Sequence, residues 1–275
     1  MDDAFAAVRR DRSRGARSLS LQALTVVDGL LERWRGLSDR WLRSRFRLVA
    51  ANLTRAQPAM GPFRRWASGW RRMARGSRTG GRLARARAWV RRERERLEEE
   101  LIGIGRTSRV RFPRAPYVVT LSRSESVLTA LRAARGSRRP RRISVLESRP
   151  GGEGKAFAAD LRRAGLPART IPDRRGAEAV ARADLLLIGA DAVFSDGSVA
   201  HKVGTKELAR TASRCGVPVV VVSGVSKFVG GPPPQRGLPP LFDRTPARYI
   251  HEYWTDRGVE RVGRTHRHPF RERFP

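Results

Sequence analysis

The chain has 275 residues, of which 58 are Lys or Arg and 26 are Asp or Glu, so its formal net charge is +32 at pH 7. This length supports one large domain or two smaller ones with a buried core. The single cysteine, Cys215, excludes an internal disulfide and a cysteine-rich metal site. No early apolar run resembles a signal peptide, and none approaches the roughly 20 residues of a membrane span, so we expect a soluble cytoplasmic protein.

The positive charge comes almost entirely from arginine. Only four basic residues are lysines, namely Lys155, Lys202, Lys206 and Lys227. A basic surplus favours polyanion partners, because cations near phosphates release counterions. An arginine surplus spread along the chain is also what a biased genomic base composition produces. Weak nucleic-acid binding through the basic surface therefore stays open, but it is not the favoured main function.

Residues 1–110 predict a small, all-helical amino-terminal domain, because apolar residues recur at helical spacing and no strand pattern is convincing. The expected helices cover residues 17–35, 38–56, 60–75 and 82–102. Five tryptophans fall in this half, and we expect them to pack the helices rather than bind nucleic acid: Trp34, Trp41, Trp66, Trp70 and Trp89. A segment rich in Gly, Arg and Pro, residues 103–116, is the expected linker.

From residue 117 the pattern changes to short apolar strands that alternate with helix-length segments. The expected strands are Tyr117–Leu121, Ile143–Leu146, Ala168–Ile171, Leu185–Ile188 and Val217–Val222. The expected helices lie near 124–135, 153–164, 175–182 and 205–214. Because parallel strands need crossover connections, the alternation predicts an α/β fold, with a Rossmann-like parallel sheet domain over residues 117–260 and helices on both faces. Residues 261–275 form a basic tail that we expect to lack an ordered end.

One stretch of the second half concentrates the candidate chemistry. The apolar run Leu185–Ile188 ends at Gly189, which places Asp191 at the carboxyl end of a strand, where ligands bind in open parallel sheets. His201 and Lys202 follow shortly afterwards. The pattern predicts a site for an anionic or sugar-like ligand. A strand, a surface loop and a capped helix without any ligand explain it equally well.

The sequence predicts neither a structural metal nor a cofactor. The spacing of His251, His266 and His268 does not resemble zinc ligation, and no Cys or carboxylate cluster accompanies them. The glycines do not form the G-x-G-x-x-G of a dinucleotide-binding fold. RPGGEGKA, around Gly151 and Gly154, is at best a weak phosphate cradle.

Five segments of the second half resemble one family in order and spacing. They are VVTLSRSESVLTAL (118–131), VLESRPGGEGKAFAADLRRAGL (145–166), LLIGADAVFSDGSVAHKVGTKELA (186–209), VPVVVVSGVSKF (217–228) and FDRTPARYIHEYWTDRGV (242–259). The family comprises the alpha, beta and delta subunits of eukaryotic translation initiation factor 2B, with aldose-ketose isomerases for methylthioribose-1-phosphate and ribose-1,5-bisphosphate. A looser resemblance covers SRGARS (13–18) and AQPAMGP (56–62).

The resemblance implies a helical amino-terminal domain, a Rossmann-like domain, a ligand pocket between them and dimerisation through the sheet domain. The family's Arg-Gly-Ala phosphate loop is matched by Arg14, Gly15 and Ala16. Asp191 matches the isomerases' catalytic aspartate, and Lys227 resembles the family's ligand-facing lysine.

Three departures from the isomerase pattern fall in the implied site. Ser122 stands where the isomerases have a catalytic cysteine, and a serine hydroxyl is a far weaker base than a thiolate. His201 replaces the Asn that precedes Lys202, and Gln57 stands where a phosphate-binding Arg is expected. These changes favour the loss of isomerase chemistry over its survival.

Two functions from different classes remain. The favoured one is a non-catalytic protein, similar to the regulatory initiation-factor subunits, that binds a sugar phosphate or nucleotide and forms a homo-oligomer. The alternative is an aldose-ketose isomerase for a 1-phosphorylated ribose derivative, in which Asp191 is the acid, His201 replaces the thiol as base and Ser122 has the cysteine's place.

Overall fold

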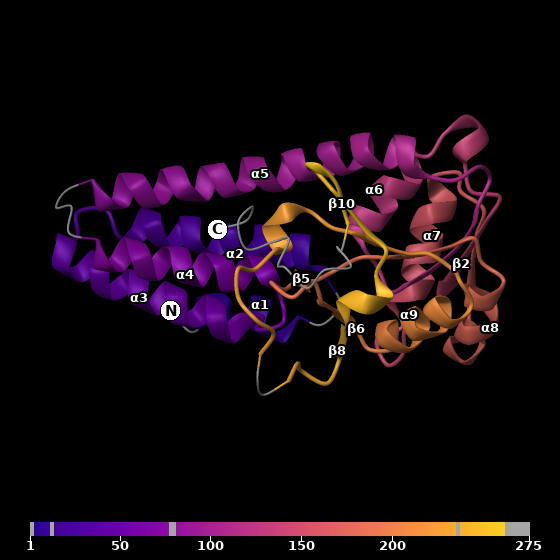
Figure 1. The fold of residues 1–275 in the computed structure, drawn as a ribbon. Coiled ribbons are helices and arrows are strands. Elements are labelled where there is room, and N and C mark those ends of the chain that lie inside the picture. The colour runs from indigo at the N-terminus through magenta and orange to yellow at the C-terminus, as the bar shows by residue number, and fades with distance from the viewer. Residues whose placement is uncertain (1–2, 12–13, 77–80, 235–236, 262–275) are drawn as a thin grey trace. The chain divides into compact units, whose positions relative to one another are not determined.

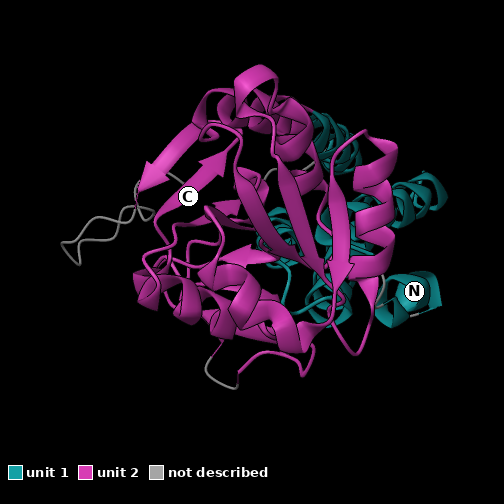
Figure 2. Cartoon of the chain, turned by 90° about the vertical axis from the view of Figure 1, so that its right-hand side faces the viewer, with its two compact units in different colours: residues 1–98 teal, residues 99–275 magenta. Residues whose placement is uncertain are grey.

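The structure, a computed structural model, describes residues 3–11, 14–76, 81–234 and 237–261. The chain divides into two compact units, unit 1 with residues 1–98 and unit 2 with residues 99–275. Figure 2 colours the two units separately. The basic tail predicted after residue 261, with His266 and His268, lies outside the described residues.

Unit 1 is helical throughout its described part, as the sequence predicts. It contains η1(Asp3–Phe5), α1(Ala6–Arg10), α2(Ala16–Arg33), α3(Asp39–Ala56), α4(Gly61–Arg75) and the first part of α5(Arg82–Arg111) (Figure 1). The short segment η1 and α1 was not predicted. It buries Phe5 and Val8 completely, so it belongs to the core of the unit.

The core of unit 1 is built from apolar helix faces and interlocked aromatic rings. Phe46 meets Trp70 edge to face at a centroid distance of 4.7 Å, and Trp89 contacts both Trp66 and Trp70 in the same way, at 5.7 and 5.4 Å. Such pairs add to the stability gained from burial alone. The prediction that the tryptophans pack the helices is wrong only for Trp41, whose side chain is 57% exposed.

Helix α5 is longer than the sequence predicts. It continues to Arg111, so most of the expected linker is helical. The boundary between the two units, at residues 98 and 99, falls inside this helix. Although α5 has 30 residues, none of the described helices combines enough length and hydropathy to cross a lipid bilayer.

Unit 2 is organised by a seven-stranded sheet with the order β10-β9-β7-β4-β1-β2-β3. Its strands are β1(Tyr117–Leu121), β2(Arg142–Leu146), β3(Ala168–Ile171), β4(Leu185–Ile188), β7(Val219–Val222), β9(Glu252–Thr255) and β10(Gly258–Arg261). All neighbouring pairs are parallel except β9 and β10, which form an antiparallel hairpin at the edge. The predicted parallel sheet is confirmed, and β9 and β10 extend it.

Helices cover both faces of this sheet (Figure 1). One face packs against α6(Glu125–Ala133), α7(Glu153–Arg163) and the end of α5, with Val118, Val145 and Leu187 at its centre. The other packs against α8(Gly176–Ala181) and α9(Thr205–Arg214), with Val119 and Ile188 among its buried residues. Burial on both faces explains why these strands read as continuous apolar runs.

A second sheet replaces the loop that the sequence predicts after Asp191. It has three antiparallel strands, β5(Ala192–Val193), β6(Val199–Lys202) and β8(Phe242–Thr245), in the order β5-β6-β8. A turn joins β5 and β6, and in it the Asp196 carboxylate accepts the backbone N–H of Ser198 at 2.9 Å. His201 and Lys202 therefore lie on a strand with fixed register.

Candidate ligand-binding site

The order of the parallel strands marks one place in unit 2 where a ligand is expected. The chain builds β1, β2 and β3 in one direction and then returns to place β4 on the other side of β1. In open α/β sheets this reversal leaves a crevice at the carboxyl ends of the two central strands. Ser122 directly follows β1 and Asp191 follows β4, so both predicted residues belong to this edge.

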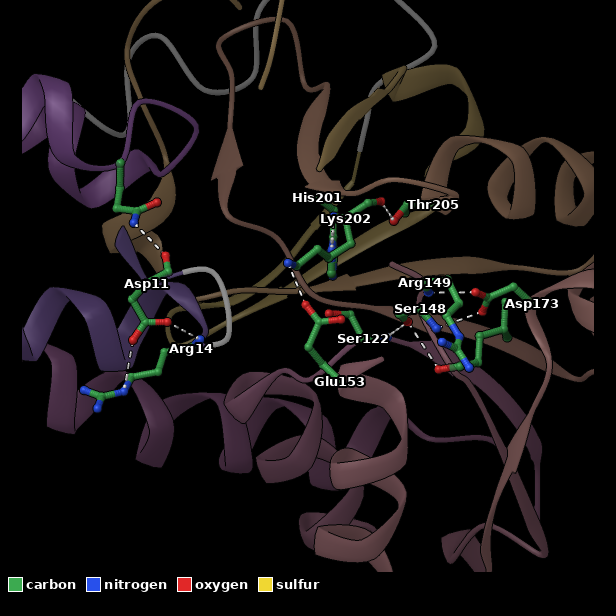
Figure 3. A network of polar contacts seen from close by, with 12 residues as sticks. Asp11, Arg14, Ser122, Ser148, Arg149, Glu153, Asp173, His201, Lys202 and Thr205 are labelled. Carbon is green, nitrogen blue, oxygen red and sulfur yellow. Dashed lines mark hydrogen bonds and ion pairs between the residues drawn. The ribbon is translucent and has the colours of Figure 1, made fainter. Parts of the chain in front are cut away.

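Ser122 is buried and held by its backbone. Its φ is +58°, in the left-handed region that residues other than glycine rarely adopt. Its N–H donates to Ser148 Oγ at 2.5 Å. Ser148 follows β2, and its own N–H donates to the Asp173 carboxylate at 2.8 Å (Figure 3). The carboxyl ends of β1 and β2 are thereby tied together at the candidate site.

Gly189 lets three segments approach one another closely. A Cβ at this position would lie 2.6 Å from Ser124 Oγ and 3.2 Å from His201 Nε2. Ser124 begins α6 and its Oγ accepts the Val127 N–H, whereas His201 comes from β6. The absence of a side chain at Gly189 thus brings a hydroxyl and an imidazole together beside the end of β4.

His201 presents a buried donor that has no partner among the described residues. Its side chain is 4% exposed, and its Nδ1 accepts the Lys202 N–H at 2.5 Å. Burial, with Lys227 and Lys202 nearby, lowers the pKa of His201 to about 3. The ring is therefore neutral near pH 7 and carries its proton on Nε2. This buried Nε2 has no hydrogen-bond partner in the described structure.

Asp191 shares this environment with two lysines. Its residue is 9% exposed, and burial raises the pKa of the carboxyl group above its ordinary value. Lys227 and Lys202 oppose that rise, and Glu153 adds to it. Desolvation prevails over both attractions, so the carboxyl group holds its proton more tightly than a solvated aspartate does.

Lys202 reaches a carboxylate that the sequence did not single out. Its Nζ lies 2.6 Å from Glu153 Oε1, and Figure 3 shows this pair at the centre of the polar network. Lys202 Nζ also lies 5.5 Å from the centre of the Phe242 ring, within cation–π range. Glu153 belongs to the first turn of α7, in the GGEG stretch that the sequence offers as a weak phosphate cradle. Lys202 thus already forms an ion pair with a carboxylate of the protein itself.

The amino end of α7 depends on two glycines. Gly152 adopts φ +70°, and a Cβ on Gly154 would overlap the carbonyl oxygen of Leu146 at the end of β2. The helix can therefore begin directly against the sheet. That close approach carries Glu153 to the same edge as Asp191.

Lys227 is held at this edge by a turn that two carboxylates anchor. It is 7% exposed and ends η4(Val225–Lys227). Glu100 accepts the Ser226 N–H at 2.6 Å and the Ser226 hydroxyl at 2.8 Å, while Asp256 accepts the Val225 N–H at 2.7 Å. Two carboxylates therefore fix the turn that carries the lysine.

The remaining predicted site residues belong to unit 1. The Arg14 N–H and Nε contact the Asp11 carboxylate at 3.0 and 3.2 Å. Gly15 precedes α2, and Ala16 begins it. Gln57 is buried and donates from Nε2 to the carbonyl oxygens of Val8 at 2.7 Å and Asp11 at 3.2 Å. These bonds give Gln57 a structural role in joining the end of α3 to the first segment of the chain.

The described part of the chain offers no group of three His, Cys, Asp or Glu side chains that could hold a metal ion. His251, which the sequence also excludes as a ligand, accepts the Val219 N–H on its Nδ1 at 3.0 Å. The chemistry at the carboxyl edge consists of a neutral imidazole, two lysines and two carboxyl groups, all from unit 2. Such a set can bind a polar, charged small molecule.

A parallel sheet in Rossmann order, with converging polar groups at the switch point and a separate helical unit before it in the chain, defines an α/β protein with a Rossmann-like domain. The family model described as the Initiation factor 2 subunit family matches residues 12–233. The chain therefore belongs to the Initiation factor 2 subunit family, and the predicted resemblance is confirmed.

Relatives in sequence carry two kinds of name. The chain is 28% identical to a ribose 1,5-bisphosphate isomerase of Haloferax volcanii over 59% of its own length and 58% of that protein. It is 28% identical to a methylthioribose-1-phosphate isomerase of Gemmatimonas aurantiaca over 94% of its length and 84% of that protein. A putative translation initiation factor eIF-2B subunit 2-like protein of Pyrococcus horikoshii is 27% identical over 61% of the chain and 65% of that protein.

Solved structures share the fold at low sequence identity. The Pyrococcus horikoshii translation initiation factor eIF-2B superposes with a TM-score of 0.80 at 23% identity, covering 95% of this chain and 97% of that one. A chain of the tetrameric eIF2B-beta2-delta2 complex from C. thermophilum gives 0.76 at 18% identity, with 94% and 89% covered. The predicted fold class, a Rossmann-like parallel sheet domain after a helical region, is confirmed.

Proposed function

We propose that the carboxyl edge of the unit 2 sheet binds a sugar phosphate or a nucleotide without converting it, as a subunit similar to those of initiation factor 2B. The observation that carries this proposal is His201 Nε2, a buried donor without a partner in the described structure. An unpaired buried polar atom costs about 1–3 kcal/mol. A ligand oxygen that accepts from Nε2 would recover this free energy.

The charged groups around His201 suit a phosphorylated, hydroxyl-bearing ligand. Lys202 and Lys227 are both largely buried, where charge-assisted hydrogen bonds to phosphate oxygens are strongest. Asp191, beside them, would bond a sugar hydroxyl. Arg14, Gly15 and Ala16, in unit 1, are proposed as phosphate-binding residues in their own right, whereas Gln57 is assigned no ligand contact.

The two candidate bases, Ser122 and His201, are both poorly suited to catalysis, which supports binding of the ligand without its conversion. Ser122 has only a hydroxyl group where the isomerases carry a thiol, and its fixed N–H bond to Ser148 does not activate it. His201 is an unsuitable base, because its pKa is near 3 and its Nε2 already bears the proton. The expected substitution of His201 for the missing thiol is therefore disfavoured.

The second candidate function is an aldose-ketose isomerase acting on a 1-phosphorylated ribose derivative. One observation favours it: burial raises the pKa of Asp191, as a general acid requires. The names of the isomerase relatives are consistent with this alternative. Self-association through the sheet domain is proposed under either function.

A ligand panel with turnover measured in parallel tests both functions. Purified protein is incubated with ribose phosphates, methylthioribose-1-phosphate and nucleoside monophosphates, and calorimetry and product analysis follow. Under the favoured function at least one compound binds and no product forms. Lys202→Ala should weaken its binding by one to a few kcal/mol, and His201→Phe should weaken it as well. Arg214→Ala, on the exposed end of α9, is the control. Product formation would establish the isomerase instead.

A further inference from the structure

The opposite edge of the unit 2 sheet, at the amino ends of β1, β2 and β3, carries a row of hollows. The first, of about 490 Å³, lies among the end of α6, the following loop and the end of α7. The second, also of about 490 Å³, lies at the start of β2 and β3, and the two share Leu166 in their walls. A third, of about 60 Å³, shares Arg142 with the second and continues to α8. Shared wall residues make the three one trough.

Arginine dominates the walls of the two larger hollows. Seven arginines line them, all exposed: Arg132, Arg135, Arg139, Arg141, Arg142, Arg162 and Arg169. No Asp or Glu is among the lining residues of these two hollows. Asp184 pairs with Arg141 at 3.1 Å, and Glu178 lines the smaller third hollow. The larger part of the trough is therefore strongly positive.

Contacts with neighbouring residues hold several of these arginine side chains in place. The Arg142 guanidinium lies 4.5 Å from the centre of the Tyr117 ring, and Arg139 donates to the Gly165 carbonyl oxygen. Arg162 donates to the Ala168 carbonyl oxygen at 3.4 Å. Each guanidinium has five N–H donors, so these contacts leave donors that can reach a phosphate in the trough.

We propose that this trough, defined by the seven arginines, binds the phosphate backbone of a nucleic acid such as RNA without regard to base sequence. One guanidinium group can donate two parallel hydrogen bonds to the oxygens of a phosphate. A row of such groups matches the regularly spaced charges of a nucleic-acid strand. The lining residues of the two larger hollows include no aromatic ring on which a base could stack. The contacts on offer are therefore to the backbone, which carries no sequence information.

The shape of the trough favours a polymer over a flat anionic membrane. Its walls are concave, and the apolar residues in them, such as Leu166, are small in number or buried. A membrane-bound surface requires exposed apolar or aromatic side chains that enter the lipid interface. A linear chain of phosphates can follow the hollows in succession. This binding site lies at the opposite strand ends from Asp191 and does not depend on the proposed ligand there.

Charge variants test the trough against the general basicity of the chain. In the trough variant Arg132, Arg135 and Arg169 are each changed to Gln; no described hydrogen bond or ion pair uses these side chains, so the fold should be kept. The control changes Arg109, Arg174 and Arg214, which are exposed and line none of the three hollows, to Gln. Both variants lose the same charge, and thermal unfolding checks that both remain folded.

Binding of a fluorescent 20-nucleotide RNA is followed by anisotropy over a range of KCl concentrations. The trough variant should bind at least about tenfold more weakly at 0.1 M KCl, with a slope of log affinity against log salt shallower by about 2, as expected for three lost phosphate contacts. The control should stay within about twofold of the wild type. Equal losses in both variants, no loss in either, or binding to phosphatidylserine vesicles but not to RNA would each overturn the proposal.

Discussion

Lys202 Nζ lies 2.6 Å from Glu153 Oε1, and the two side chains are only 17% and 8% exposed. The pair joins the strand β6 to the first turn of α7 at the carboxyl edge of the sheet. Any anion that binds Lys202 therefore competes with a carboxylate that the protein itself supplies. The strength of this competition can be measured by removing the carboxylate.

The first prediction is that Glu153→Gln converts the edge into a stronger phosphate site. Loss of the carboxylate removes the ion-pair partner of the largely buried Lys202, which should lower the free energy of unfolding by about 2–4 kcal/mol in phosphate-free buffer. Inorganic phosphate should then restore stability, because a ligand that binds only the folded state adds RT ln(1 + [L]/Kd). Urea unfolding at constant ionic strength, with and without 20 mM phosphate, measures both effects.

The matched control for this experiment is Glu32→Gln. Glu32 pairs with Arg35 and Arg87 on the surface, with 52% of its side chain exposed, so its removal should change stability by less than about 1 kcal/mol. A Glu153→Gln protein that phosphate stabilises no more than it stabilises the wild type would show that the carboxylate does not compete for Lys202.

The second prediction concerns Gly154, whose position admits no side chain. A Cβ there would overlap the Leu146 carbonyl oxygen, so Gly154→Ala has to push α7 away from β2. We expect a loss of more than about 3 kcal/mol of stability, as for overpacking against rigid backbone. Gly29→Ala, within α2 and with nothing inside 4 Å of the added Cβ, should instead gain up to about 1 kcal/mol. Equal unfolding midpoints for the two variants would contradict this account.

The third prediction is a pH dependence caused by Glu100. Burial raises the pKa of this carboxyl group above its ordinary value of 4.5, against the lowering effect of Ser226. The folded chain therefore binds more protons than the unfolded chain between the two pKa values, and its stability falls as pH rises through that window. Glu100→Gln lacks this titration. The stability of the wild type relative to the variant should fall above about pH 4.5, by at most about 1.4 kcal/mol per pH unit.

Urea unfolding of both proteins between pH 4.5 and 7.5 measures this difference directly. Comparing the two proteins cancels the titration of groups that they share, such as Asp191. Parallel stability curves over the whole range would mean that Glu100 has the same proton affinity in both states.

The fourth prediction separates the two proposed functions at Ser122. Under the non-catalytic proposal, Ser122→Cys keeps ligand affinity within a few-fold and gives no turnover, because no described base is placed to activate the thiol. Appearance of turnover in this variant, and its loss on adding Asp191→Asn, would support the isomerase plan. Product analysis of wild type and variants with the bound sugar phosphate decides between these outcomes.

Most of the parallel sheet could be predicted because its strands are buried on both faces. β1, β3 and β4 have the bounds expected from their apolar runs. The strands β5, β6 and β8 could not be predicted, because they form no continuous apolar run and β8 pairs with β6 from 40 to 46 positions away. Their stability derives from tertiary pairing rather than local pattern.

The linker was mispredicted for a comparable reason. Gly103 suggests a helix end, yet it lies inside α5, where a Cβ would collide with the backbone of Asp256. The glycine permits the β9–β10 turn to approach the helix; it does not break the helix. Within the site, Asp191 and His201 were visible at a predicted strand end or shortly after it. The role of Glu100 could not be predicted from the sequence, because its partner Ser226 is 126 residues away.

The shortness of the strands has an electrostatic consequence. β1 and β2 have five residues each and β4 has four, so the trough arginines and the carboxyl edge are roughly 15 Å apart at about 3.3 Å per residue. The Debye length is about 8 Å at 0.15 M salt and about 30 Å at 0.01 M. In dilute buffer the positive potential of one strand end therefore extends to the other and attracts any anion approaching His201. Apparent affinities for small phosphates should then depend on arginines that never touch them, and this dependence should vanish at physiological ionic strength.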